Sequence, residues 1–155
     1  MPISTRIKNH LEQRHIPYLP VAHPSSYTAQ GAAAVMHVAG REVAKTVVVQ
    51  AGNEYFLAVT PASYHVNVDK LAGAIGHPTR LATEGEFSSL FPDCEIGAVP
   101  PLGELYGLRV FVDESLATDR EIIFNAGTHR DAIRITYEDF VSLAKPTVCS
   151  FATKG

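Results

Sequence analysis

The sequence predicts an α/β fold with a mixed β-sheet that is strongly curved or barrel-like and carries flanking helices. Short runs rich in β-branched and aromatic residues are joined partly by tight turns and partly by helical segments, which is typical of a mixed sheet. No GxGxxG follows the first strand and no GxxxxGK[ST] occurs, so a doubly wound nucleotide-binding fold is not indicated. A length of 155 residues suits one domain spanning 1–155.

The N-terminal part predicts two helices. Isoleucine and leucine at positions 3, 7 and 11 recur at helical spacing, Ser4 can cap that helix, and Pro17 prevents its continuation. Residues 17–24 contain several prolines and read as extended chain. The Ala-rich segment 29–39 then predicts a second helix, which Gly40 ends.

The middle of the chain predicts a hairpin and short alternating elements. "KTVVVQ" (45–50) and "EYFLAVT" (54–60) flank the turn "AGN", and the valine run predicts a strand covered on both faces. Three short elements follow: a helix begun by Asn67 or Asp69 and stopped at Gly76, a strand over 79–83, and a helix over 84–91.

The C-terminal part begins with a loop rich in glycine and proline over 95–107. The remaining pattern predicts a strand over 108–113, a hairpin formed by 120–127 and 132–137, and a last helix over 138–145 that ends before Pro146.

Composition excludes several classes of protein. The apolar share of 46% and the charged share of 19% are ordinary for a globular protein. A net charge of −3 offers no broad cationic field for nucleic acid, so we expect no DNA partner, and any RNA contact must be local or assisted by another protein. The longest apolar run, 31–40, is too short to span a membrane. Two distant cysteines and an opening segment without an apolar core favour the cytoplasm.

Lys45 is the first candidate for chemistry, because it stands directly before three valines of a buried strand. A lysine at the start of a strand is most often a rim charge whose stem covers apolar surface. The functional interpretation is that its ammonium stabilises negative charge on a substrate oxygen or binds a phosphate, with the Thr46 hydroxyl beside it.

Two loops are further candidates. In "GAVPPLG" (97–103), Gly97 permits close backbone approach to a ligand, while Pro101 and its neighbour stiffen the chain, so free amides could face an oxyanion. The turn "NAGTHRD" (125–131) needs Gly127 for a positive φ if it is only a hairpin turn. Its functional interpretation is a pocket that orients a small substrate, lined by Asn125, Thr128 and His129.

No metal or cofactor is predicted. The seven histidines show no HExxH motif and no paired spacing typical of zinc ligands. No residue pattern indicates a base that would activate Cys94 as a nucleophile. Tyr27 follows "HPSS" and fits either packing at a helix entry or a pocket wall.

Four segments taken in order resemble a known family: "VAKTVVV", "YFLAVTPASYHVNVDKLAGAIG", "GAVPPLG" and "NAGTHRDAIRI". Together they are similar to the YbaK/EbsC family, the bacterial prolyl-tRNA editing domain, which is found alone and inserted in prolyl-tRNA synthetases. The resemblance extends from about Tyr27 to Ile135, and its specificity lies in the joint order of the motifs rather than in any one of them.

The resemblance implies hydrolysis of the ester in mischarged tRNA(Pro), releasing cysteine or alanine. It implies that Lys45 is the main functional residue, that the family's Gly-x-x-x-Pro loop corresponds to Gly97 and Pro101, and that residues 125–129 line the amino-acid pocket with Tyr27 near it. The acceptor end of mischarged tRNA is then the partner, with prolyl-tRNA synthetase or an elongation factor to deliver it.

The resemblance leaves the amino acid open. Thr46 matches the cysteine-clearing members, whereas Asn125 departs from their serine and His129 resembles the alanine-clearing type. Lys45 could act on the oxyanion or hold the tRNA acceptor end. The alternatives to a deacylase are a tRNA- or amino-acid-binding module that has lost catalysis, and an unrelated small-molecule enzyme on a similar fold.

Overall fold

The computed structural model describes residues 5–22, 43–95, 98–118, 120–128 and 131–154. The expected Ala-rich helix over 29–39 lies outside these residues. The chain elements, in order, are α1 (Thr5–Gln13), β1 (Leu19–Ala22), β2 (Ala44–Ala51), β3 (Glu54–Pro61), β4 (Tyr64–Val66), α3 (Val68–Ile75), β5 (Thr79–Leu81), α4 (Glu84–Phe87), η2 (Ser88–Leu90), η3 (Gly103–Tyr106), β6 (Arg109–Asp113), η4 (Glu114–Thr118), β7 (Glu121–Asn125), β8 (Asp131–Thr136), α5 (Tyr137–Ala144), β9 (Thr147–Cys149) and β10 (Ala152–Lys154).

The main sheet has the strand order β5-β2-β3-β6-β9 and is mixed, as the sequence predicts. β2 pairs antiparallel with β3 and β5, whereas β6 runs parallel to both β3 and β9. A second sheet has the order β1-β8-β7, and β10 pairs with β4. A parallel bridge between Val43 and Ile123 connects the start of β2 to β7, so the two sheets continue around one core.

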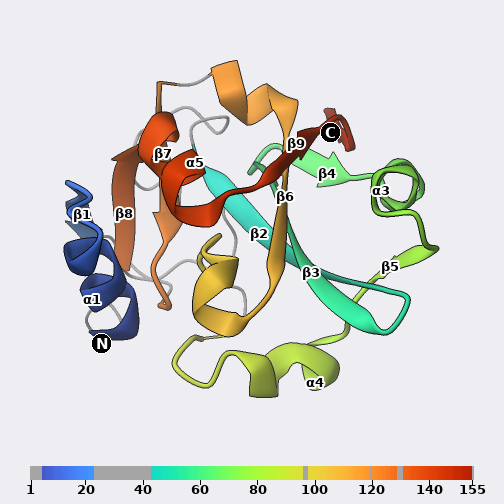
Figure 1. The fold of residues 1–155 in the computed structure, drawn as a ribbon, viewed down its shortest axis with the longest axis horizontal. Helices are drawn as coiled ribbons and strands as arrows, with labels where there is room; N and C mark the ends of the chain where they lie inside the picture. Colours follow the sequence, from blue (N-terminus) through green and yellow to red (C-terminus); the bar gives the residue numbers. More distant parts are fainter. Residues whose placement is uncertain (1–4, 23–42, 96–97, 119, 129–130, 155) are drawn as a thin grey trace.

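Figure 1 places β2, β3 and β6 through the middle of the molecule, with α3 and β5 on one side and β1 and β8 on the other. The larger core lies between the two sheets, and it includes Val48, Leu57 and Phe124. The smaller core lies on the opposite face of the main sheet and includes Val49 and Phe111. Successive side chains of a strand point to opposite faces, so the valine run of β2 serves both cores, which confirms the expectation of a doubly covered strand.

Local capping explains the helix boundaries. The Asn67 side chain accepts hydrogen bonds from the backbone N–H groups of Asp69 and Lys70, and α3 ends at Gly76 in the left-handed conformation. Both boundaries confirm the sequence-based prediction. Thr136 caps α5 in the same way.

The structure corrects three expectations about secondary structure. The helix predicted over 84–91 is one α-helical turn followed by a 3-10 turn, because Thr83 and Glu86 form a capping box that organises only the first turn. The loop 95–107 contains the short η3. The strands β4, β9 and β10 were not predicted, since each has three residues and gains its ladder from a distant partner.

Candidate functional site

Lys45 is the second residue of β2, and its Cα partner in the ladder is Thr60 of β3. The side chain is half-buried, and burial lowers the pKa of its ammonium below the ordinary value of 10.5. In the described part of the chain, no carboxylate forms a salt bridge with it. A partly desolvated cation without such a partner is well suited to bind negative charge from outside the protein.

The bridge between β2 and β7 aligns Lys45 with the predicted pocket turn. Val43 pairs with Ile123 in parallel. Paired residues of parallel strands lie on the same face, and the residues two positions further along are Lys45 and Asn125. This register places the half-buried Asn125 level with Lys45 on the neighbouring strand, and its role in a pocket stays a prediction.

The two candidate loops meet at Gly127. Its N–H donates to the Ala98 carbonyl at 3.0 Å, and its own carbonyl accepts from the Glu95 N–H at 2.7 Å. Gly127 has φ 94°, which confirms the positive φ predicted for this position. The turn after β7 and the loop before η3 are thus joined through the backbone, although Ala98 and Gly127 are 29 positions apart in the sequence.

Thr128 is buried and fixed by its own turn. Its hydroxyl donates to Asp131 Oδ2 at 2.6 Å and accepts from the Asp131 N–H at 3.0 Å. Asp131 was not among the predicted site residues. The signal was available, since an acidic residue three positions after a threonine often closes such a turn.

Thr46 lies on the face of β2 opposite to Lys45. Its neighbours in the strand alternation, Ala44 and Val48, both belong to the larger core. Its hydroxyl is buried without a hydrogen-bond partner among the described residues. It lines a cavity of about 250 Å³ together with Phe87 and Val99. The expected hydroxyl beside the ammonium is therefore not found there.

The remaining predicted residues divide into two groups. Pro101 is buried with the rest of 98–103, so the loop that carries it is packed into the protein. Tyr27, Gly97 and His129 lie outside the described residues, and their roles stay predictions.

Asp113 ends β6 at the same level as Thr60, because Val59 pairs with Val112. Its Oδ1 accepts from the N–H groups of Phe151 and Ala152, both at 2.8 Å, and its Oδ2 accepts from Ser115. Burial alone raises the pKa of Asp113, but these donors outweigh it and hold the pKa below its ordinary value. This carboxylate is fully engaged in holding the C-terminal segment.

Cys94 lies at the base of the 95–102 loop and is half-buried. Its sulfur is 3.2 Å from the Tyr106 hydroxyl, and that hydroxyl also donates to Asp93. Burial raises the pKa of the Cys94 thiol to about 11, so the thiol is protonated at neutral pH. This agrees with the sequence interpretation that Cys94 is not a nucleophile.

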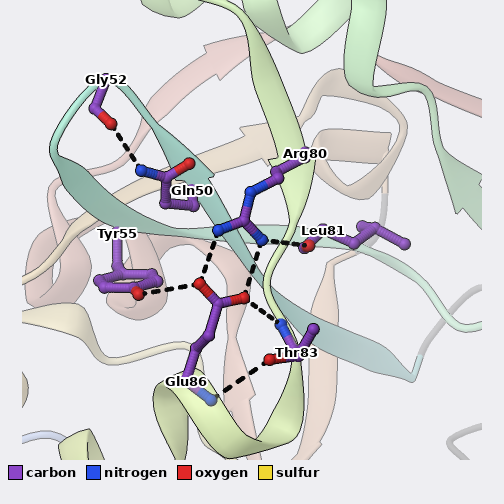
Figure 2. A network of polar contacts seen from close by, with 7 residues as sticks. All are labelled: Gln50, Gly52, Tyr55, Arg80, Leu81, Thr83 and Glu86. Atoms are coloured by element: carbon purple, nitrogen blue, oxygen red, sulfur yellow. Dashed lines mark hydrogen bonds and ion pairs between the residues drawn. The ribbon is translucent and has the colours of Figure 1, made fainter.

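Figure 2 shows the polar network at the turn end of the β2–β3 hairpin. The Arg80 guanidinium donates to both carboxylate oxygens of Glu86, at 2.8 and 2.6 Å. Tyr55 donates to the same carboxylate at 3.2 Å, and the Thr83 N–H does so at 2.9 Å. The hydrogen bonds from Arg80 hold the pKa of Glu86 well below its usual range. The network joins β5 and α4, which bear one wall of the cavity beside Thr46, to β3.

The described residues contain no group of three or more His, Cys, Asp or Glu side chains placed to hold a metal ion. They also contain no helix with both the length and the apolar character needed to cross a bilayer.

Comparison with known proteins gives a consistent result. The family model described as the aminoacyl-tRNA editing domain matches residues 23–143. The multifunctional Ser/Thr-tRNA deacylase ProXp-y of Escherichia coli strain K12 is 30% identical over 102 residues, and the protein of the same description from E. coli O157:H7 matches equally. The match covers 64% of this chain and 60% of the length of those relatives.

Solved structures share the fold over nearly the whole chain. A candidate trans-editing enzyme for prolyl tRNA synthetase has a TM-score of 0.84 at 25% identity, covering 97% of this chain and 96% of the other. The hypothetical protein APE2540 has a TM-score of 0.87 at 20% identity, covering 96% of this chain and 99% of the other. These likenesses confirm the predicted mixed α/β editing-domain fold.

Proposed function

The chain belongs to the aminoacyl-tRNA editing domain family, and on that premise we propose that it hydrolyses the ester bond of tRNA charged with the wrong small amino acid. The observation that carries the proposal is Lys45, a half-buried ammonium without a described salt-bridge partner, level with Asn125 where the two loops join at Gly127. The strands β2, β3, β6 and β7, which surround Lys45, all lie within residues 23–143, the range that the family model matches.

The chemistry assigned to Lys45 is stabilisation of the oxyanion. A water oxygen attacks the ester carbonyl carbon and forms a tetrahedral intermediate with a negative oxygen. The ester C–O bond then breaks, the ribose oxygen leaves, and it takes a proton from the attacking water. A fixed ammonium beside the oxyanion lowers this barrier because it acts where water is partly excluded. Pro101 and the buried loop around it provide a rigid support for backbone donors.

The predicted substrates are tRNA(Pro) charged with cysteine or alanine, and the name of the E. coli relative adds serine and threonine. All four side chains are small, which suits the proposed amino-acid pocket at the turn that begins with Asn125 and Gly127. With a net charge of −3 the protein has few phosphate contacts to offer, so we expect prolyl-tRNA synthetase or an elongation factor to assist delivery in the cytoplasm.

The test is single-turnover deacylation of tRNA(Pro) charged separately with cysteine, alanine, serine, threonine and proline. We expect release of one or more non-cognate residues by the native protein and retention of proline. The Lys45→Ala variant should lose about 100-fold or more of the rate. Lys70→Ala, at an exposed lysine of α3, is the matched control and should keep the native rate.

Two results would contradict the proposal. No release above the spontaneous rate from any charged tRNA, with tRNA still bound, would indicate the binding module that lacks catalysis. Equal rates for native protein and Lys45→Ala, with circular dichroism confirming that both are folded, would remove Lys45 from the mechanism. A different outcome, weaker tRNA binding with an unchanged single-turnover rate at saturating protein, would place Lys45 on the tRNA acceptor end rather than on the oxyanion.

A further inference from the structure

A second cavity, of about 250 Å³, lies where α5 runs into β9 beside the start of β6 (Figure 1). Its lining includes Arg109, Lys145 and Thr147, together with the carboxylate residue Glu104. None of these residues belongs to the site around Lys45. Two cations and a hydroxyl around one hollow form a donor set for an anion.

The parallel pairing of β6 with β9 explains why the two cations meet. Phe111 pairs with Thr147. Lys145 comes two residues before Thr147, at the end of α5, and it lines the same cavity as Arg109. Like charges placed side by side repel each other unless an anion lies between them.

Arg109 is held in place without a carboxylate partner. Its guanidinium carbon lies 5.7 Å from the centre of the Phe56 ring and 5.5 Å from that of Phe111, within the range of cation–π contacts. No salt bridge to Arg109 is formed in the part of the chain that the structure describes. The rings hold the face of the guanidinium, and its in-plane N–H groups are left for a ligand.

The other charges around the cavity do not cancel this cationic character. Glu104 forms an ion pair with Arg14, so its charge is already balanced. Lys145 ends α5 with φ 46°, and its N–H donates to the Val141 carbonyl at 2.9 Å. A cation at a helix C-terminus is stabilised by the helix dipole, which accounts for Lys145 alone. It does not account for Arg109, which contacts two aromatic rings but has no salt bridge among the described residues.

We propose that this cavity binds one phosphate group of the tRNA backbone, held by Arg109 and Lys145 with the Thr147 hydroxyl as a further donor. The inference rests on the proposed function, because it takes the substrate to be tRNA. Arg109 is four residues before Asp113 on β6, and Asp113 lies level with Thr60, the partner of Lys45. The cavity is thus displaced from Lys45 by about 13 Å along the strands, at 3.3 Å per residue.

The test compares tRNA binding by Arg109→Gln, Lys145→Gln and the double variant with the native protein. Fluorescence anisotropy with uncharged tRNA over a salt series gives the affinity and its salt dependence. We expect each single variant to bind about 5-fold more weakly at low salt, and the slope of log K against log salt to become shallower by about one in the double variant. Arg109→Lys, which keeps the charge but loses the planar stacked guanidinium, should restore the salt dependence and only part of the affinity.

Controls separate this site from general charge loss. Lys8→Gln and Lys70→Gln remove exposed lysines of α1 and α3 without touching the cavity. If they weaken binding as much as the cavity variants do, the effect is one of net charge and the inference is overturned. If inorganic phosphate raises the melting temperature of the native protein but not of Arg109→Gln, while tRNA binds both equally, the cavity takes free phosphate and the inference is again overturned.

Failure of this inference differs from failure of the proposed function. Equal tRNA affinity of the native protein and the double variant, with Lys45-dependent deacylation intact, would overturn only the phosphate site. Weakened tRNA binding by the double variant, with no deacylation by the native protein, would support the phosphate site and overturn the proposed activity.

Discussion

Charged side chains are paired at one end of the β2–β3 ladder and lack a described carboxylate partner at the other. At the turn end, the exposed Arg80 and Glu86 form a two-point ion pair that Tyr55 and Thr83 extend (Figure 2). At the other end, Lys45 is half-buried and has no described carboxylate partner. The ion pair between Arg80 and Glu86 satisfies both side chains within the protein and supports its structure. The half-buried ammonium of Lys45 has no such described partner and is available to a ligand.

A third charged residue, Asp113, lies level with Lys45 in the main sheet. Asp113, two strands away, is buried but receives donors from Ser115, Phe151 and Ala152. Its oxygens accept from Ser115 and from the C-terminal segment, and among the described residues it forms no salt bridge with Lys45. Neighbouring ionised groups on one sheet can therefore have separate functions, one in chemistry and one in stability.

The largest effect should come from changing the protonation of Lys45. Only the ammonium stabilises an oxyanion, so the kcat/KM of deacylation should fall as the pH rises through the lowered pKa, on an alkaline limb below pH 10.5. Lys45→Arg keeps its charge to higher pH and should move that limb upward, whatever its absolute rate. The measurement is a pH–rate profile, with spontaneous ester hydrolysis subtracted at each pH. An alkaline limb at the same pH in both proteins would contradict the role of this ammonium.

An intermediate effect is expected at Asp113. Asp113→Asn places an amide N–H₂ group against the Ser115 donors, and the loss should be about 2 kcal/mol of unfolding free energy at pH 7. Because the pKa of Asp113 is lower in the folded state, its stabilisation is present above pH 3.8 and is lost as the pH falls through the folded-state pKa. The difference between native and variant should therefore shrink in acid.

Urea unfolding at pH 7 and at pH 3 measures this difference. Glu54→Gln, at an exposed position of β3, is the control and should change stability little at either pH. A difference between native protein and Asp113→Asn that stays constant from neutral to acid pH would show that the carboxylate charge is not what stabilises the C-terminal segment.

The smallest effect is expected at the turn end of the ladder. Glu86→Gln removes the charge that Arg80 binds, but the pair is exposed and screened by solvent. The melting temperature should fall only slightly at low salt, and the difference should fade at high salt. A large drop that persists at high salt would mean that the network supports the cavity wall beside Thr46 rather than merely covering the surface.

Several features of the fold could be read from the sequence because they depend on neighbouring residues. The caps of α3, the hairpin of β2 with β3 and the positive φ of Gly127 are all set by local geometry. The alternation that separates Lys45 from Thr46 was also present in the strand pattern, and applying it would have placed Thr46 in the core.

By itself, the sequence determined which residue types are available: a lysine before a valine run, a proline-stiffened loop and a turn that needs glycine. Only the tertiary structure decided that Ala98 lies against Gly127, that Asn125 lies level with Lys45, and that Arg109 and Lys145 line one cavity. These meetings depend on parallel registers and backbone hydrogen bonds between segments far apart in the chain. No local propensity encodes such pairings, because their energy is gained only when the whole core has formed.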